Sequence, residues 1–282
     1  VWFLPNFNPI KIITFISITG VLLGVAALII VLAVMNGFET DLREKILGIN
    51  AHVVLMQYTG MMKDHERVKE AVEQVDGVVA STPFIYSQAM LKKGDNVHGI
   101  VLRGLSPADA SKVINLGKTT EGGLDLLTPE GRRTLKLGPE ATGLPGIIVG
   151  KELAKNLGIF LYDTLYVVSP MGISTPVGMV PRMKKFLVVG IFESGFYEYD
   201  LSLAYASLGD TQEFLNIDDL VTGIEIKVND IYRANEIAAA IEKKLGFPFW
   251  VRDWMKMNKN LFAALKMERR VMFIILSLIV LV

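Results

Sequence analysis

The chain of 282 residues carries 29 basic and 29 acidic side chains, so its formal net charge at pH 7 is zero. A protein that neutralises nucleic-acid phosphates needs a clustered basic excess, so this balance argues against nucleic acid as a partner. Cysteine is absent, which excludes disulfides, thiolate metal sites and a cysteine nucleophile within this chain. With 51% hydrophobic residues and a mean hydropathy of +0.41, the composition indicates membrane segments joined to a soluble region.

The first membrane signal is Ile12–Met35, an uncharged run of 24 mostly apolar residues. At about 1.5 Å per residue such a helix covers the roughly 30 Å apolar core of a bilayer. A secretory signal peptide is the alternative, but its apolar region spans only about 7 to 15 residues before a cleavage site with small residues. Ala33-Val34-Met35 matches such a site poorly, so the pattern favours a retained transmembrane helix.

Within this span, Gly20 and Gly24 have the G-x-x-x-G spacing that lets a second helix approach closely. This predicts a helix-packing face. The same spacing also arises by chance in membrane helices, so tolerated glycine is an equally good interpretation.

The second membrane signal is Val271–Val282, which follows Glu268-Arg269-Arg270. Its 12 residues cannot complete a span of about 20, so we expect the natural chain to continue beyond Val282. Because residue 1 is not methionine, we also expect residues before Val1. Two spans would place the long section between them on one side of the membrane.

Both spans are predicted to continue as helical stalks. After the first span an apolar stripe recurs with helical period, and the helix is expected to end near Gly48. A similar stripe through Asn258–Arg270 runs into the second span. Continuous helices of this kind could carry motion between membrane and domain, or could simply pack on the domain as amphipathic helices. The stripes are Phe38, Leu42, Ile46 and Ile49, and Leu261, Phe262, Leu265 and Met272.

The section between the stalks predicts a mixed α/β domain. Alternation and helical spacing predict a β-α-β-β unit near its beginning and a β-α-β unit near its end. Together these units predict a split βαβ, ferredoxin-like lobe, interrupted by an inserted β-rich lobe over residues 106–219. The fold class is therefore an α+β membrane protein with transmembrane helices flanking this domain. The first unit comprises His52–Gln57, Asp64–Val75, Val78–Lys92 and Val97–Leu102, and the second comprises Gly223–Val228, Tyr232–Leu245 and Phe249–Val251.

The inserted lobe contains four strand candidates and one helix candidate. These are Gly146–Val149, Thr164–Ser169, Lys185–Phe192 and Leu203–Ala206, with a helix over Lys151–Leu157. The predicted domain scheme is residues 1–48 for the first span and stalk, 49–105 and 220–255 for the α/β lobe, 106–219 for the inserted lobe, and 256–282 for the second stalk and span.

No pattern in the sequence predicts catalysis. Gly117-Lys118-Thr119 and Gly150-Lys151 resemble the end of a phosphate-binding loop, but the required first glycine is Lys112 in one case and Pro145 in the other. Any ATP used must therefore be hydrolysed by another polypeptide. The histidines, His52, His65 and His98, have no metal-ligand spacing and are expected at the surface or in turns. We therefore expect no catalytic, cofactor or metal site in this chain.

The connection over residues 170–184 is unusually apolar for an exposed loop. Its three prolines are expected to prevent regular strand pairing, and its three methionines could present adaptable hydrophobic surface to a partner. A loop folded back on its own lobe explains the same pattern. The residues concerned are Pro170, Met171, Pro176, Met179, Pro181 and Met183, followed by Lys184.

Two stretches resemble a known family. Val34–Val53, which reads Val-Met-Asn-Gly-Phe-Glu at its start and Ile-Leu-Gly-Ile-Asn-Ala-His-Val at its end, resembles the LolC/LolE family of membrane subunits of the lipoprotein-releasing ABC transporter. The stretch from Trp254 through Leu261-Phe262 to Lys266-Met267-Glu268 is similar to the entry of that family into its second span. The likeness extends over essentially the whole chain.

The resemblance implies a multi-pass subunit of the bacterial inner membrane, with the large domain in the periplasm. It implies a homo- or heterodimer of two such membrane subunits, served by a LolD-like ATPase that holds the ATP and Mg²⁺. Like MacB-type proteins, such subunits work by mechanotransmission: ATP-driven movement extracts a triacylated lipoprotein from the outer leaflet and hands it to the periplasmic chaperone LolA.

The resemblance also assigns roles to residues. The segment 170–184 resembles the chaperone-recruiting hook of LolC, although Met183-Lys184 stands where the family has a polar and basic pair. Met35, Phe38 and Leu42 are implied as contacts for membrane lipid or the lipoprotein in a cavity.

Two alternative functions remain open from the sequence: a MacB-like efflux permease, and a membrane-tethered sensor or scaffold without transport.

Overall fold

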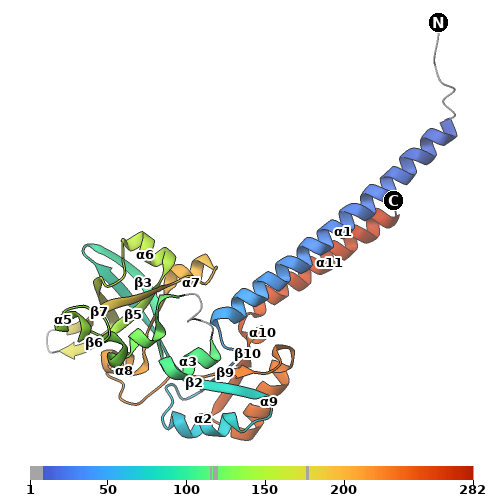
Figure 1. The fold of residues 1–282 in the computed structure, drawn as a ribbon. Helices are drawn as coiled ribbons and strands as arrows, with labels where there is room; N and C mark the ends of the chain where they lie inside the picture. Colours follow the sequence, from blue (N-terminus) through green and yellow to red (C-terminus); the bar gives the residue numbers. More distant parts are fainter. Residues whose placement is uncertain (1–8, 115, 117–119, 176–177, 282) are drawn as a thin grey trace. The chain divides into compact units, whose positions relative to one another are not determined.

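The computed structural model describes residues 9–114, 116, 120–175 and 178–281 of the chain. Contacts divide the chain into two compact units, residues 1–44 with 258–282 (unit 1) and residues 45–257 (unit 2). Unit 1 is helical, and unit 2 contains every described strand (Figure 1).

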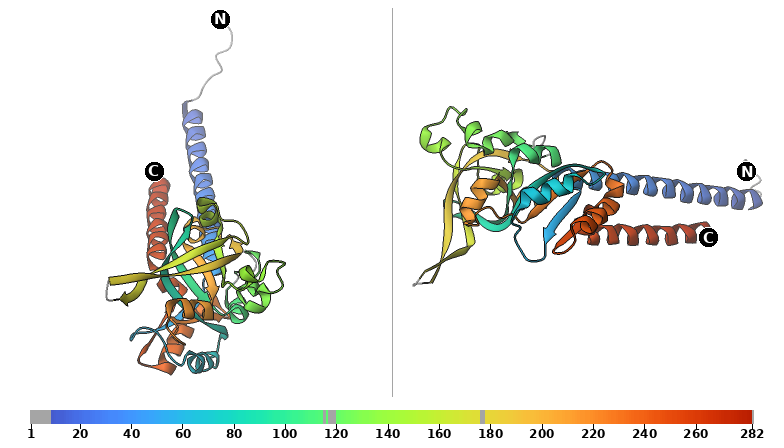
Figure 2. Two further views of the ribbon diagram at one scale, coloured as in Figure 1. Left: turned by 90° about the vertical axis from the view of Figure 1, so that its left-hand side faces the viewer. Right: turned by 90° about the horizontal axis from the view of Figure 1, so that it is seen from below.

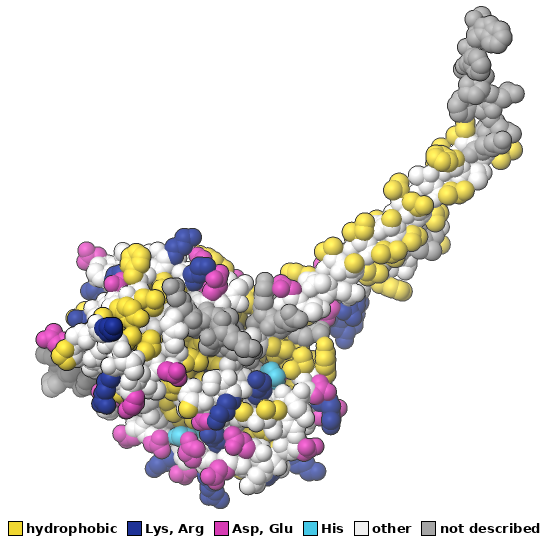
Figure 3. Space-filling view, viewed as in Figure 1, with side chains coloured by type: hydrophobic (Ala, Val, Ile, Leu, Met, Phe, Trp, Pro, Cys, Tyr) yellow, Lys and Arg dark blue, Asp and Glu magenta, His cyan; other side chains and the backbone are white. Residues whose placement is uncertain are grey.

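Unit 1 is a pair of long helices, α1 (Pro9–Ile49, which extends into unit 2) and α11 (Lys259–Leu281). Within α1, Ile12–Asp41 is long and apolar enough to cross a membrane, with a mean hydropathy of 2.8 and none of its most apolar window buried. Figure 3 shows hydrophobic side chains spread over the surface of this helix. The predicted stalks are confirmed as helix, because α1 passes Gly48 by one residue and α11 runs unbroken through Arg270.

The two ends of unit 2 meet in one sheet. Its strands are β1 (Val53–Gln57), β2 (Val78–Lys93), β9 (Gly223–Val228) and β10 (Phe249–Asp253), arranged in the order β10-β1-β9-β2 with every neighbouring pair antiparallel. Helix α2 (His65–Glu73) follows β1, and helix α9 (Ala234–Leu245) follows β9. Lys244 of α9 donates a hydrogen bond to the Ala71 carbonyl of α2 at 2.9 Å, which joins the two helices.

The middle of unit 2 closes into a six-stranded barrel. Its strands pair in the ring β2-β3-β8-β5-β7-β6 and back to β2, so each has a partner on both sides. The strands that join β2 in the ring are β3 (Asn96–Leu105), β5 (Gly146–Gly150), β6 (Thr164–Thr175), β7 (Gly178–Phe192) and β8 (Leu203–Ser207). Closure removes exposed edges, which would otherwise pair with other chains.

Alternation along the strands fills the barrel interior. Inward-facing residues such as Leu91, Leu102, Val167 and Phe186 are fully buried, while their strand neighbours face outward. Side chains of α6 (Lys151–Leu157) and α8 (Leu208–Leu215) complete this core. The strand candidates and the Lys151–Leu157 helix predicted for the insertion are therefore confirmed, although closure into a barrel was not anticipated.

A second core covers part of the outside of the barrel. Helix α3 (Pro107–Val113) and the 3-10 helix η2 (Leu124–Leu127) contribute to this core, which includes Ile148, Leu187 and Tyr205 of the barrel wall; α4 (Pro129–Arg132) follows η2. The remaining elements are β4 (Thr120–Gly122), which pairs with β7, and α5 (Pro139–Thr142), α7 (Tyr197–Ser202), η3 (Ile231–Arg233) and α10 (Trp254–Met257). The sequence analysis did not predict these short elements.

A buried ion pair links the barrel to the β10-β1-β9-β2 sheet. The guanidinium of Arg103 on β3, which is fully buried, donates to the Glu225 carboxylate on β9, which is 3% exposed. The guanidinium lies 5.3 Å from the ring centre of Tyr86 and 5.6 Å from that of Tyr205. Burial raises the pKa of the Glu225 carboxyl group, and the neighbouring Arg103 opposes that shift.

One expectation about the histidines was wrong. His65 is buried at the start of α2, where its ring nitrogen lies 3.1 Å from the Asp219 carboxylate. His52 is half-buried, with its ring nitrogen 3.1 Å from the Val228 carbonyl oxygen. Each ring therefore connects segments far apart in sequence, which a spacing argument cannot detect.

Candidate functional site

The segment predicted as a loop over residues 170–184 is a β-hairpin. Strands β6 and β7 pair from Thr164 opposite Leu187 to Ser169 opposite Arg182, and pairing resumes from Ile173 opposite Val180. The expectation of a loop is therefore wrong: regular pairing is interrupted between Ser169 and Ile173 but continues on both sides. Figure 2 shows this hairpin projecting from the rest of unit 2.

The prolines lie where the pairing is irregular. Pro170 and Pro181 fall at the register shift, where three residues of β6 face one residue of β7. Proline cannot donate a ladder hydrogen bond and is tolerated at such bulges. Gly172 lies in the same irregularity, and a Cβ atom there would be 2.3 Å from the Val180 carbonyl oxygen, so the two backbones approach closely only because this residue is glycine.

The bulge therefore brings Pro170, Gly172 and Pro181 to one level of the hairpin. Pro170 and Pro181 are both exposed to solvent there. Pro176 lies outside the described residues, as do the side chains of Met171 and Met179.

Met183 and Lys184, grouped together in the sequence analysis, lie on opposite faces of β7. Met183 points outward and is 58% exposed. Lys184 is opposite the inward-facing Val167, and its ammonium group lies 2.8 Å from the Glu213 carboxylate of α8. Met183 is thus available to a partner, whereas Lys184 already has an ion-pair partner within unit 2.

The exposed face of β7 continues across the barrel wall. Met90 of β2, Val168 of β6 and Met183 lie in register, and the next row contains Lys92, Tyr166 and Lys185. Met90 and Tyr166 are 37% and 43% exposed. We call these six residues the outer wall: an apolar row bordered by two lysines, next to the projecting hairpin.

The predicted lipid contacts lie on α1. Phe38 is 51% exposed and Met35 is half-buried, while the side chain of Leu42 lies outside the described residues. A Cβ atom at Gly20 would meet nothing within 4 Å, so no described residue of this chain packs there. The exposed apolar surface of α1 therefore requires lipid or other helices to cover it.

The described residues contain no group of three or more His, Asp or Glu side chains placed to hold a metal ion. The Arg103–Glu225 pair is buried inside unit 2, and neither residue lines the cavity that includes Glu39 and Ile274 or the cavity that includes Gln57 and Phe249. What the described surface offers is apolar area for macromolecular contacts.

Comparison with known proteins finds relatives named as lipoprotein-releasing system proteins. The "Lipoprotein-releasing system transmembrane protein LolC" of Neisseria meningitidis serogroup B is 35% identical over 270 residues, covering 95% of this chain and 62% of that protein. LolC of Xylella fastidiosa is 36% identical over 272 residues, covering 96% and 62%. The "Lipoprotein-releasing system transmembrane protein LolE" of Haemophilus influenzae is 22% identical over 280 residues, covering 97% and 64%. This chain thus spans about 62% of the length of the first two curated relatives.

Among solved structures, the periplasmic region of MacB from Actinobacillus actinomycetemcomitans matches with a TM-score of 0.47 and 12% identity, covering 77% of this chain and 95% of that one. The extracellular domain of the noncanonic ABC-type transporter YknZ matches with a TM-score of 0.45 and 11% identity, covering 71% and 99%. The profile of the MacB-like periplasmic core domain family matches residues 14–244. That match covers most of the chain and accords with its mixed α/β content, so the chain belongs to the MacB-like periplasmic core domain family and is LolC-like within it.

Proposed function

We propose that this chain is the main part of a membrane subunit that extracts lipoproteins from the outer leaflet of the bacterial inner membrane for transfer to a periplasmic chaperone. The observation that carries the proposal is the 35–36% identity to LolC proteins over 95–96% of the chain. The apolar, unburied span of α1 supports it, because a lipid-handling subunit needs such a surface in the membrane.

In this proposal the protein is multi-pass and unit 2 is periplasmic. The strand order β10-β1-β9-β2, with α2 and α9 as crossovers, supports the interpretation of residues 49–105 and 220–255 as a ferredoxin-like split βαβ lobe. Residues 106–219 then contribute the inserted β-rich lobe, which completes its barrel with β2 and β3 of the first lobe. Residues 1–48 and 256–282 provide the stalks and spans.

The chain itself performs no catalysis in this mechanism. A LolD-like ATPase would hold ATP and Mg²⁺, and a second LolC/LolE-type membrane subunit would complete a dimer. Met35, Phe38 and Leu42 would contact the acyl chains of a triacylated lipoprotein. Burial of each methylene contributes about 0.8 kcal/mol, so holding the lipid is favourable and ATP-driven movement must supply the work of release.

The β6–β7 hairpin is the proposed binding site for the chaperone, which in the lipoprotein-releasing system is LolA. Its projection from unit 2, the exposed prolines at its bulge and the exposed Met183 support this role. Methionine side chains adapt to different apolar shapes, which suits a transient handover.

Depletion of the protein tests the broad function. Lipoproteins destined for other membranes should accumulate in the inner membrane, and a copurifying ATPase should be recovered with the tagged subunit. Normal lipoprotein sorting after depletion would overturn the proposal, and absence of any ATPase would favour a membrane-tethered sensor or scaffold.

A pull-down tests the hairpin. Met171, Met179 and Met183 changed together to Ser should abolish capture of the chaperone, because the changes remove apolar side chains from the hairpin. Met61 and Met257, which are 36% and 39% exposed elsewhere in unit 2, provide the matched control when changed to Ser. Undiminished capture by the triple variant would remove the hairpin from the mechanism.

A second candidate function, MacB-like efflux or another mechanotransmission task, is favoured by the family profile over residues 14–244. Deletion of residues 170–184 separates the two candidates. Under the efflux function transport should persist after the deletion, whereas a lipoprotein extractor should lose transfer to its chaperone.

A further inference from the structure

Unit 1 contains a cavity of about 810 Å³ on the surface of its helix pair. Its wall is largely apolar and comes from α11, with Glu39 contributed by α1. The apolar lining residues are Phe262, Leu265, Phe273 and Ile274. Its volume lies in the range of cavities that hold small ligands or the ends of larger amphiphiles.

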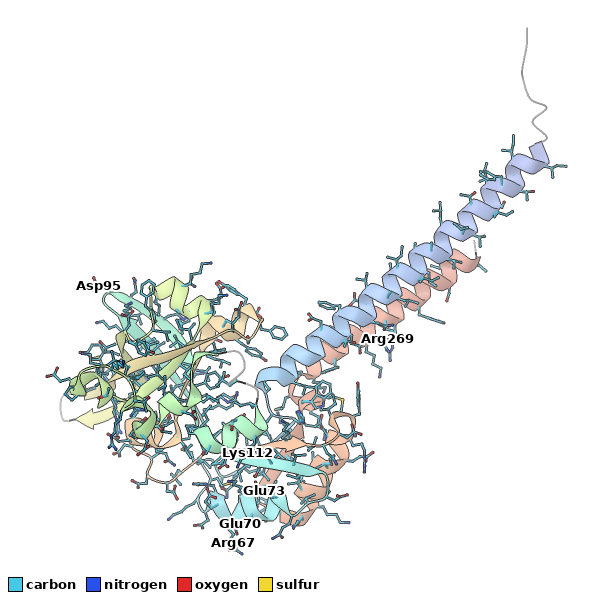
Figure 4. All side chains as sticks on the ribbon, viewed as in Figure 1. Arg67, Glu70, Glu73, Asp95, Lys112 and Arg269 are labelled. Atoms are coloured by element: carbon cyan, nitrogen blue, oxygen red, sulfur yellow. The ribbon has the colours of Figure 1, made fainter. Side chains whose placement is uncertain are left out.

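Three cations line the same cavity: Lys266, Arg269 and Arg270. The Arg269 guanidinium lies 2.5 Å from the Glu39 carboxylate, and Figure 4 labels Arg269 on α11 beside α1. Among the described side chains, neither Lys266 nor Arg270 lies within ion-pair distance of an acidic group. The cavity thus has an uncompensated positive charge, although the whole chain is neutral.

The cations mark a boundary along α11. Charged residues end at Arg270, and the apolar run from Val271 to Leu281 begins directly after it. A helix with this sequence places its last cations at the lipid headgroups and its following residues among the acyl chains. Phe273 and Ile274 lie within the first turn of the apolar run, on the cavity wall.

We propose that this cavity binds one anionic phospholipid, whose phosphate-bearing headgroup contacts Lys266 and Arg270 and whose acyl chain lies along Phe273 and Ile274. Charge complementarity selects this occupant. An apolar helix from another subunit would bury the two cations without compensation, and a zwitterionic lipid carries a cation of its own. The proposal requires only that α11 enters a membrane and is independent of lipoprotein extraction.

The test uses the full-length subunit with its copurifying partners in phosphatidylcholine nanodiscs. Residues 1–282 contain no cysteine, so Leu278→Cys, one helical turn beyond Ile274, carries the fluorophore after any cysteine elsewhere in the full-length subunit or its partners is replaced by serine. Phosphatidylglycerol or phosphatidylcholine with brominated acyl chains is titrated in, and quenching reports contact. We expect half-maximal quenching at a mole fraction at least tenfold lower for phosphatidylglycerol, a preference of about 1.4 kcal/mol.

Matched variants separate a site from general surface charge. Lys266→Gln with Arg270→Gln should abolish the preference, whereas Lys266→Arg with Arg270→Lys should retain it. Lys259→Gln removes one charge from an exposed position of α11 outside the cavity and should leave the preference intact. Equal quenching by the two lipids, no quenching by either, or an equal loss in Lys259→Gln would overturn the proposal.

Discussion

The buried pair of Arg103 and Glu225 yields a prediction in which the two single substitutions differ in their pH dependence. Glu225→Gln leaves the Arg103 guanidinium, which has no exposed surface, without its counter-charge. Removing one partner of a buried pair costs about 3–5 kcal/mol. The rings of Tyr86 and Tyr205 stay within 6 Å of the cation and offset part of that cost, at about 0.5–2 kcal/mol each. We expect a loss of about 3 kcal/mol, a large fraction of a typical stability of about 5–15 kcal/mol.

The reverse substitution, Arg103→Met, leaves Glu225 buried and alone. Burial already raises the pKa of this carboxyl group with Arg103 present, and loss of the guanidinium removes the opposing influence. A group whose pKa is raised in the folded state stabilises that state below its unfolded pKa, and this contribution is lost as pH rises through the folded pKa. Arg103→Met should therefore cost little near pH 5 and progressively more toward pH 8. The stability of the Glu225→Gln variant should gain no pH dependence from this site, because no carboxyl group remains there and the guanidinium cannot release its proton.

Chemical unfolding in detergent, followed by tryptophan fluorescence, measures both effects. Trp254 is 2% exposed and donates its indole hydrogen to the Ile231 carbonyl oxygen at 2.9 Å, so its emission reports the unfolding of unit 2. Arg233→Gln breaks an ion pair with Glu236 in which both side chains are 63% exposed, and should change stability by less than about 1 kcal/mol. A Glu225→Gln loss no larger than this control, or an Arg103→Met loss that is flat between about pH 5 and 8, would refute the reasoning.

Three further substitutions test the barrel and its hairpin. Gly172→Ala places a Cβ atom 2.3 Å from the Val180 carbonyl oxygen. Amide hydrogen exchange along the hairpin should therefore accelerate, while the free energy of global unfolding stays unchanged. Hairpin amides that exchange as slowly as in the unmodified protein would contradict this. The Lys93 ammonium lies 2.5 Å from the Asp163 carboxylate and holds the pKa of that carboxyl group below its ordinary value. The ion pair therefore stabilises the fold above about pH 4, and this stabilisation is lost as the pH falls and the carboxylate is protonated. Asp163→Asn should therefore reduce the fall in the free energy of unfolding below about pH 4. An unchanged fall would exclude the Lys93–Asp163 pair as its cause. Leu91→Ala leaves a cavity in the fully buried barrel interior and should lower the free energy of unfolding by about 2–5 kcal/mol in the same fluorescence assay. A loss below about 1 kcal/mol would argue against a packed interior.

Local patterns predicted the long helices from their apolar runs and helical spacing, and predicted some strands from alternation. Strand β2 is an example: in its second half Ala89 and Leu91 face the interior while Met90 and Lys92 face out, and the turn at Gly94 returns the chain into β3. Closure of the barrel could not be predicted in this way. It depends on β6 pairing with β2 across some 75 residues of chain, and alternation indicates which face of a strand is buried without indicating its neighbour.

The hairpin and the histidines show where residue type alone is misleading. Prolines in 170–184 were interpreted as barriers to pairing, yet a bulge accommodates two of them while the strands continue on both sides. A polar residue such as His65 was expected at the surface, but a carboxylate from a distant segment makes its burial possible. The burial of His65 depends on a residue 154 positions away, which the local sequence does not indicate, whereas the hairpin had one local signal in Gly172, which permits close backbone approach.

The continuity of the hairpin with the barrel has a consequence for partner binding. Leu165 and Phe186, paired across β6 and β7, are buried in the barrel interior, so the base of the hairpin is held by a packed core. The direction in which the hairpin projects is then fixed before a partner arrives, and binding costs less conformational entropy than ordering a free loop would. A force applied to the hairpin would also reach the barrel directly through the paired strands β6 and β7. A loop folded back on its own lobe would offer neither property, and the projecting, strand-paired geometry therefore favours a partner-binding role over the packing interpretation.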